Sequence, residues 1–316
     1  MEYIIADLRV SLPDHLAAGH FSRALAPFAV TASGADLSGP DVLLLTGDCP
    51  PPGTDYREID RFDFSDADAA CRFGRDSAGY LLEMTPRDGS ATAHFRMRRD
   101  APEVLTDYSL HHHPALLRFG LWTAFNIAAL RRMSLAIHSS VLLYRGQAVL
   151  FLGESGTGKS THTRLWREHI PGAELLNDDS PIVRIVGGER SNDAEPAFLH
   201  LPGLPPQELP VALACGSPWS GKTPCYRNEC YPIRAFVRLS QAPHNRIRKL
   251  QPLASIGALL PSCPPAFAHD KALFDRVCDT VAGLLALVDV YHLECLPDAA
   301  AARLVCQTLF PHETDC

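Results

Sequence analysis

The chain has 316 residues, of which 46% are hydrophobic and 21% are charged, a composition that is typical of globular proteins and excludes a disordered chain. Its formal net charge of −7 offers no basic surface, so we expect no nucleic-acid partner. No apolar run approaches membrane-spanning length, and the N-terminus mixes charged with apolar residues, which predicts a cytoplasmic protein with no membrane partner.

Short apolar and alternating runs separated by turns occupy the first hundred residues, a pattern typical of β-strands. We expect strands over residues 3–10, 41–45, 56–64, 79–84 and 92–97. They predict a smaller, mostly β N-terminal domain of residues 1–105. Residues 114–131 then repeat apolar side chains at helical spacing after a proline, which predicts a helix connecting to a second domain of residues 106–316.

The second domain alternates strands with helices, which predicts an α/β (α+β) fold. The expected strands cover residues 135–137, 141–144, 147–152, 175–176, 182–186, 233–239 and 288–293. The expected helices cover residues 159–169, 253–260, 270–287 and 299–309. Arg145-Gly146 and Gly187-Gly188 are the expected hairpin turns.

The ten cysteines are scattered along the chain, and none forms a Cys-x-x-Cys pair. This spacing argues against a zinc ribbon and against a redox motif. We expect most of them to be reduced, small core residues.

A complete phosphate-binding loop follows the apolar run at residues 147–152. It consists of Gly153, Glu154, Ser155, Gly156, Thr157, Gly158, Lys159, Ser160 and Thr161. A glycine-rich turn lets backbone N–H groups converge on phosphate, and the following helix directs its positive end at the anion. Lys159 supplies a charge and the Ser160 hydroxyl reaches a metal ion, so the loop predicts binding of ATP with Mg²⁺, or with Mn²⁺ in its place.

Phosphoryl transfer also needs an acid to hold the metal ion and a group that deprotonates or orients the acceptor. Asp178 and Asp179 follow Lys159 by the length of one helix and a return strand, so the same sheet edge would carry them and the loop. Adjacent residues at a strand end face opposite sides, so one carboxylate can bind metal while the other faces the acceptor. The pattern leaves their allocation open, and we assign Asp178 as base and Asp179 as metal ligand.

His138 ends an expected strand before the Arg145-Gly146 turn. A hairpin through that turn would bring the imidazole beside the phosphate loop, where it could contact the γ-phosphate or bind metal. A lone histidine in a strand can equally be a structural residue, and the spacing alone does not decide between these alternatives.

These segments resemble the catalytic core shared by HPr kinase/phosphorylase and ATP-dependent phosphoenolpyruvate carboxykinase. The similarity lies in residues 137–141, in the phosphate loop 153–161 and in Asn177-Asp178-Asp179, and their order and spacing also agree. The resemblance implies a mixed-sheet nucleotide-binding core, unlike the parallel sheet of ordinary phosphate-loop proteins, over residues 106–316. It further implies that His138 helps to hold the catalytic metal and that the acid pair supplies metal binding and a base. The HPr-binding signature is not found, so the resemblance indicates an HPr kinase-like protein with another acceptor.

Residues 216–228 form a loop rich in glycine, proline and serine, with Lys222 and Arg227 suited to hold phosphate or an acceptor carboxylate. Trp219 and Tyr226 could pack against a substrate. We interpret this segment as a substrate-side loop, with a plain exposed connection as the alternative.

The sequence therefore predicts an ATP-dependent kinase that transfers the γ-phosphate to a serine-type hydroxyl of a protein, peptide or small molecule. Asp178, His138 and Lys159 are the expected catalytic residues, and Ser160, Asp179 and His138 the expected metal ligands. A carboxykinase-like lyase acting on an oxaloacetate-like acid and a non-catalytic ATP sensor are the alternatives. A homo-oligomer is left open.

Overall fold

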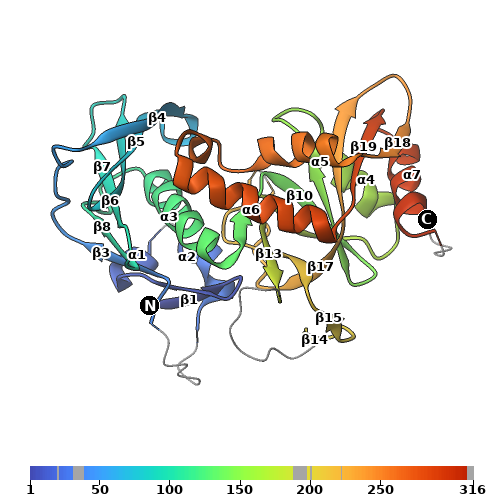
Figure 1. Ribbon diagram of the computed structural model, residues 1–316, viewed down its shortest axis with the longest axis horizontal. Coiled ribbons are helices and arrows are strands. Elements are labelled where there is room, and N and C mark those ends of the chain that lie inside the picture. The colour runs from blue at the N-terminus through green and yellow to red at the C-terminus, as the bar shows by residue number, and fades with distance from the viewer. Residues whose placement is uncertain (20, 31–38, 188–197, 200, 222, 312–316) are drawn as a thin grey trace. The chain divides into compact units, whose positions relative to one another are not determined.

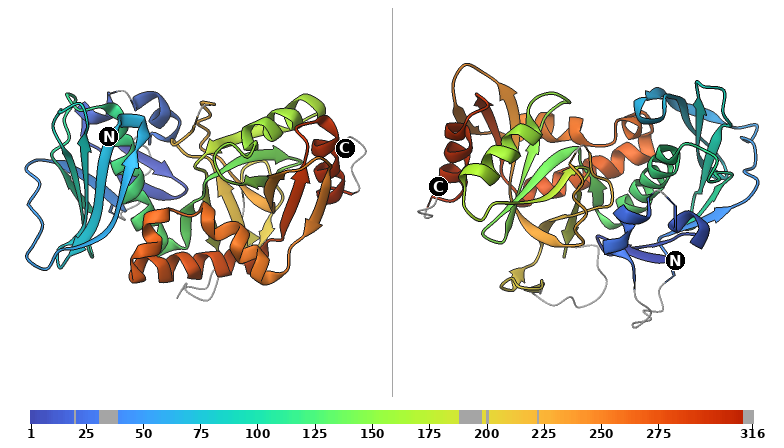
Figure 2. Two further views of the ribbon diagram at one scale, coloured as in Figure 1. Left: turned by 90° about the horizontal axis from the view of Figure 1, so that it is seen from above. Right: turned by 180° about the vertical axis from the view of Figure 1, so that it is seen from behind.

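Two mixed β-sheets organise the chain, one in each of the two units into which it divides (Figures 1 and 2). The first unit comprises Met1–Arg131 with Ala266–Phe274, and the second comprises Arg132–Pro265 with Asp275–Cys316. The structure is a computed structural model that describes residues 1–19, 21–30, 39–187, 198–199, 201–221 and 223–311. The mixed α/β class expected from the sequence is confirmed.

The first unit contains an eight-stranded sheet in the order β1-β2-β3-β8-β7-β6-β5-β4. Its strands are β1 (Glu2–Ile5), β2 (Leu8–Ser11), β3 (Val42–Thr46), β4 (Arg57–Phe64), β5 (Ala69–Asp76), β6 (Gly79–Pro86), β7 (Ala93–Arg98) and β8 (Glu103–Thr106). Its helices are α1 (Asp14–Ala17), α2 (Ser22–Leu25) and α3 (Pro114–Ala129). Pairing is parallel between β2 and β3 and between β3 and β8, and antiparallel elsewhere, so the sheet is mixed.

The first expected strand is wrong in one respect, because residues 3–10 form a hairpin instead of one strand. Ala6 and Asp7 have φ of 48° and 63°, so the chain reverses at two non-glycine residues that carry no turn signature in the sequence. Strands β5 and β8 and the two short N-terminal helices were not anticipated.

Helix α3 is a part of the first unit, which extends to Arg131 and so passes the boundary expected near residue 105. The helix packs closely on the sheet at Gly120, where an added Cβ would lie 2.5 Å from the ring of Phe95. Phe119 stacks on Phe64 with ring centroids 4.6 Å apart. The apolar face of α3 therefore covers this sheet.

The second unit is built on a nine-stranded sheet with the main order β12-β10-β11-β17-β16-β13-β9, and β19 joins β17 to β18. Its strands are β9 (Ser134–Ala136), β10 (Ser139–Tyr144), β11 (Gln147–Leu152), β12 (Glu174–Asp179), β13 (Ile182–Val186), β16 (Val211–Cys215), β17 (Cys230–Gln241), β18 (Arg246–Lys249) and β19 (Val290–Cys295). Helices α4 (Lys159–His169), α5 (Pro252–Leu259), α6 (Lys271–Leu287) and α7 (Ala299–Leu309) accompany it, and β14 (Phe198–Leu199) pairs with β15 (Gln207–Glu208) apart from it. Strand β11 pairs parallel with β17 and antiparallel with β10, so this sheet is also mixed.

Helices α4 and α7 lie together on one face of this sheet (Figure 2) and enclose its main hydrophobic core. Trp166 of α4 is fully buried, with its ring 6.1 Å from that of Tyr144 and 6.0 Å from that of Phe151. Val305 and Leu309 of α7 complete the cluster. This core fixes the position of α4, whose first residue is Lys159.

Six of the cysteines in the described residues are free thiols, as expected for most of them, but Cys215 and Cys230 form a disulfide between β16 and β17, and Cys306 is also disulfide-bonded. Adjacent antiparallel strands bring residues 215 and 230 opposite each other, a relation that their separation in the sequence does not reveal. Among the described residues, only Cys71 and Cys263 are buried free thiols. None of the helices in the described ranges is long and apolar enough to cross a membrane.

Replacing Trp166 with alanine should destabilise the second unit by about 3–5 kcal/mol, because the substitution leaves a large cavity between α4 and the sheet. Urea unfolding followed by far-ultraviolet circular dichroism measures this loss. Arg167→Ala, at the exposed neighbouring position, should change stability by less than about 0.5 kcal/mol. Equal effects of the two substitutions would contradict the core assignment.

Candidate active site

The phosphate loop connects the C-terminal end of β11 to the first turn of α4, as the sequence predicts. Gly153, Gly156 and Gly158 have φ of 150°, 83° and 102°, conformations that L side chains rarely adopt. A Cβ at Gly153 would also lie 2.5 Å from the Thr157 hydroxyl, which donates to the Glu154 carbonyl at 2.8 Å. The glycines therefore allow loop conformations that residues with a side chain would rarely adopt at the start of α4.

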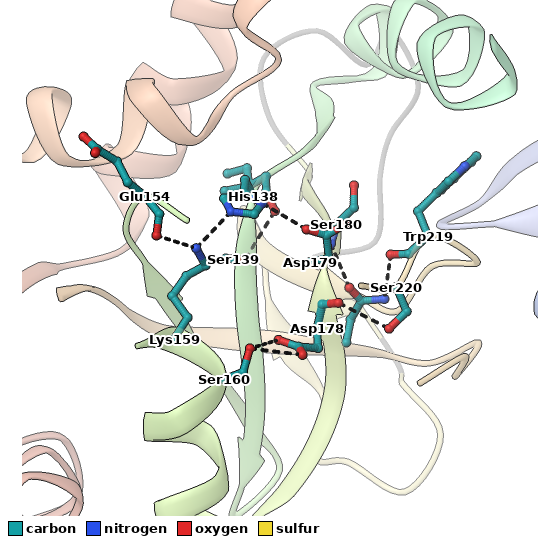
Figure 3. A network of polar contacts seen from close by, with 12 residues as sticks. His138, Ser139, Glu154, Lys159, Ser160, Asp178, Asp179, Ser180, Trp219 and Ser220 are labelled. Carbon is teal, nitrogen blue, oxygen red and sulfur yellow. Dashed lines mark hydrogen bonds and ion pairs between the residues drawn. The ribbon is translucent and has the colours of Figure 1, made fainter. Parts of the chain in front are cut away.

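Lys159 is the central charge of the site and is only 9% exposed. Its Nζ donates to the carbonyl of Gly153 at 2.6 Å and to that of Glu154 at 3.2 Å. It also donates to Nε2 of His138 at 2.9 Å (Figure 3). Burial lowers the pKa of the Lys159 ammonium below its usual 10.5, while Asp179 and Asp178 act in the opposite direction.

His138 lies between Lys159 and Asp179, where the hairpin of β10 and β11 was expected to bring it. An ammonium group has no lone pair, so Nε2 of the ring must accept from Lys159 and Nδ1 carries the proton. Nδ1 is 3.1 Å from Asp179 Oδ1, within ion-pair distance. The backbone N–H of His138 donates to the Ser262 carbonyl at 2.7 Å. This hydrogen bond holds the backbone that carries the imidazole ring. A chain of polar contacts therefore runs from Lys159 through His138 to Asp179.

The two carboxylates reach the loop because β12 pairs with β10, which pairs in turn with β11. Asp178 is opposite Ser140 and Asp179 is opposite Ser139, so the two side chains leave the strand on different sides. Both carboxylate oxygens of Asp178 are 3.2 Å from the Ser160 hydroxyl (Figure 3).

The two acids also differ in burial and in backbone conformation. Asp178 is 6% exposed, whereas the side chain of Asp179 is 40% exposed beside His138. The φ of Asp179 is 133°, a region that favours glycine, so its position carries backbone strain of about 1–3 kcal/mol. Strain of this kind persists only where the surrounding contacts determine the conformation.

A buried polar network behind the acid pair supplies those contacts. Asn177 is fully buried, and its Nδ2 donates to the Ser217 and Trp219 carbonyls at 3.3 and 3.4 Å. Its Oδ1 accepts the backbone N–H of Ser180 at 3.0 Å, and the Ser217 hydroxyl donates to the Ser180 carbonyl at 2.6 Å. The backbone N–H of Gly221 donates to the Asp178 carbonyl. The turn after β12 is thus held against residues 217–221.

The loop at residues 216–228 therefore differs from the expected substrate-side segment. Trp219 is 2% exposed and Ser220 is 1% exposed, so this part of the loop supports the acid pair from inside. Lys222 lies outside the described residues. Arg227 forms ion pairs with Glu174 at 2.8 Å and Glu229 at 2.6 Å, which direct its guanidinium toward the edge of β12.

The donors gathered here fit a hard divalent cation such as Mg²⁺. The described residues contain no group of three or more His, Cys, Asp or Glu side chains arranged as a metal cage. Mg²⁺ rarely uses such a cage, because it retains several waters and takes one or two carboxylates together with substrate phosphates. The adjacent Ser160 hydroxyl and Asp178 carboxylate match that requirement.

Comparison with known proteins adds little to this geometry. No protein-family profile and no curated protein matches the chain. The chain is similar to a solved structure, the HPr(Ser) kinase/phosphatase from Coxiella burnetii, with 12% identity and a TM-score of 0.24 over 56% of this chain and 93% of that one. That degree of similarity does not establish a shared activity, so the functional conclusion depends on the site.

Replacing Asn177 with alanine should lower stability by about 1–3 kcal/mol, because the substitution leaves buried polar partners unsatisfied. Urea unfolding measures the loss, and amide hydrogen exchange over residues 216–221 should become faster. Asn228→Ala, an exposed asparagine of the same loop, is the matched control and should change neither quantity. Unchanged exchange in the Asn177 variant would contradict its role in holding the loop.

Proposed function

We propose that this protein is an ATP-dependent phosphotransferase that moves the γ-phosphate to a hydroxyl group of an acceptor. The supporting observation is the pair of linked contacts around the phosphate loop, Lys159–His138–Asp179 on one side and Ser160–Asp178 on the other. A protein that only binds nucleotide needs a phosphate loop, but it does not need a second, partly exposed carboxylate oriented by a histidine. The motif resemblance to the HPr kinase branch is consistent with this function.

The loop amides and Lys159 would hold the β- and γ-phosphates of ATP. The three N–H groups of the Lys159 ammonium now contact two loop carbonyls and His138, so ATP binding would exchange at least one of these contacts for a phosphate oxygen. Ser160 and Asp178 would hold Mg²⁺, which when bound neutralises charge on the β- and γ-phosphate oxygens.

The contacts favour the reverse of our sequence-based allocation of the two acids. Asp178 is buried against the Ser160 hydroxyl, the position of a metal-side carboxylate, so we assign it to Mg²⁺. Asp179 is partly exposed and lies within ion-pair distance of His138, so we assign it as the base. His138 then orients Asp179 and stands next to Lys159, where the γ-phosphate would lie.

The proposed transfer is a single displacement. The acceptor oxygen forms a bond to the γ-phosphorus as the bond from that phosphorus to the β–γ bridging oxygen breaks, and ADP leaves with the electron pair. The acceptor proton passes to the Asp179 carboxylate. Acceptors with a serine-type hydroxyl suit a carboxylate base of this kind, whether on a protein, a peptide or a small molecule.

Replacing Lys159 with alanine should weaken ATP binding by about 10- to 100-fold, because a charge-assisted hydrogen bond to phosphate is lost. Isothermal titration calorimetry with ATP and Mg²⁺ measures the change. Lys249→Ala, which removes a lysine from β18, should bind ATP as the unaltered protein does. Unchanged affinity in the Lys159 variant would exclude the loop as the nucleotide site.

Asparagine substitutions should distinguish the proposed roles of Asp178 and Asp179. Asp179→Asn should leave ATP affinity within about twofold and reduce γ-phosphate transfer by about 10²–10⁴-fold, since a general base contributes that much. Asp178→Asn should instead raise the Mg²⁺ concentration needed for half-maximal transfer by about 10- to 100-fold. Transfer is followed with γ-labelled ATP and cell extract as the source of acceptor, by the mass of one added phosphoryl group.

If only the Asp179 variant needed a higher Mg²⁺ concentration for transfer, Asp179 would be the metal ligand and Asp178 the base. Label that appears on no species of the extract, while ATP binds normally, would contradict the kinase and favour a nucleotide sensor. Nucleotide-dependent release of CO₂ from an oxaloacetate-like acid would favour the lyase.

A further inference from the structure

A second feature of the same unit, a cavity of about 560 Å³, opens beside the phosphate loop. The loop residues 156–158 and the first turns of α4 form one wall. The end of β17 with Gln241 and Ala242 forms another, and residues 295–297 after β19 complete it. Ligand pockets of small-molecule sites commonly have volumes of about 300–1,000 Å³, so the cavity has the size of such a site.

The cavity lies on the side of the loop that the proposed chemistry leaves free. Thr161 and His162, which follow the metal-side Ser160, line it, whereas Lys159, His138 and Asp179 do not. If the γ-phosphate lies at Lys159, the β- and α-phosphates lie along the amides at the start of α4. The nucleoside then lies beyond the α-phosphate, next to Thr161 and His162, and these two residues line the cavity.

The walls of the cavity are largely apolar. Among the residues that the structure describes, none that lines it is Asp, Glu, Lys or Arg. His162 is 3% exposed, and burial lowers its pKa to about 4, so the ring is neutral at physiological pH. Its Nε2 accepts the indole N–H of Trp166 at 3.2 Å, and the Gln241 amide donates to the Gly156 carbonyl at 3.3 Å. The His162 Nε2 and the Gln241 amide N–H therefore already have protein partners, and Leu239 and Leu165 provide apolar surface.

We infer that this cavity is the nucleoside subsite of the nucleotide and that it holds the base through apolar contact with little discrimination between adenine and guanine. The inference rests on the proposed function, because it takes the loop as the site of the triphosphate. An uncharged, flat aromatic base suits apolar walls, whereas selection of one purine requires polar groups aimed at its edge. ATP and GTP should therefore bind with affinities within about fivefold of each other.

Cys295 gives this inference a direct readout, because its partly buried thiol belongs to the wall of the cavity. Its backbone carbonyl accepts from the N–H of Ala242 at 3.1 Å, which joins the two sides of the pocket. A bound nucleoside would cover the thiol. Inorganic tripolyphosphate, which has no nucleoside, would occupy the loop and leave the thiol accessible.

The first experiment measures the rate at which N-ethylmaleimide modifies Cys295, by peptide mass spectrometry of the full-length protein with Mg²⁺. Saturating ATP or GTP should slow modification by about tenfold, and tripolyphosphate should slow it by less than about twofold. Cys278, a partly buried thiol outside this cavity, is the internal control and should react equally in all samples. Equal protection by ATP and tripolyphosphate, or ATP binding without protection, would overturn the subsite and leave the phosphate loop assignment intact.

The second experiment fills the cavity with Ala242→Phe. ATP and GTP should bind about tenfold more weakly, whereas tripolyphosphate should bind within about twofold of its affinity for the unaltered protein. Ala286→Phe, on the exposed surface of α6, is the matched control and should bind all three ligands normally. Unchanged ATP affinity in Ala242→Phe would overturn the subsite, and failure of the unaltered protein to bind ATP would overturn the proposed function as well.

Discussion

The pairing of β12 with β10 is the constraint on which the candidate site depends. Strand β10 lies between β11, which leads into the phosphate loop, and β12, which ends in the two acids. Hydrogen bonds between backbones set this order, so the distance between lysine and carboxylates follows from register and not from flexible side chains. A shift of one residue in β12 would exchange the sides that Asp178 and Asp179 face.

Burial then distinguishes two chemically identical side chains. Asp178 is enclosed with the Ser160 hydroxyl, and Asp179 is partly exposed with an imidazole between it and the Lys159 ammonium. The low dielectric of the protein interior strengthens each of these polar contacts and makes an unpaired buried charge costly. Each of these polar side chains accordingly has a partner. The buried Asn177 network stabilises the strained turn that carries Asp179.

The sequence predicted helices and the phosphate loop of the second unit well, because the patterns that indicate them involve residues close together in the sequence. Helices α4 and α7 have the bounds expected from apolar periodicity, and the phosphate loop follows from its glycines alone. The juxtaposition of His138 with Lys159 was also expected, since a short hairpin leaves few alternatives. The allocation of the acids was not predictable, because it depends on which face of β12 meets α4.

Features that depend on tertiary structure escaped the sequence. The polar composition of residues 216–228 suggested an exposed loop, but Trp219 and Ser217 are buried because Asn177 offers them hydrogen-bond partners forty residues away in the sequence. The disulfide between Cys215 and Cys230 likewise reflects strand pairing. The sequence could not assign α3 to the first unit, because that assignment depends on which sheet its apolar face covers.

The most direct measurement of the central claim is a crystal structure of the protein with Mg²⁺ and a non-hydrolysable ATP analogue. We expect the γ-phosphate in contact with Lys159, the metal ion bound by Ser160 with Asp178, and the Asp179 carboxylate facing the open side of the γ-phosphate. A nucleotide bound elsewhere, or a γ-phosphate that neither carboxylate approaches, would contradict the account.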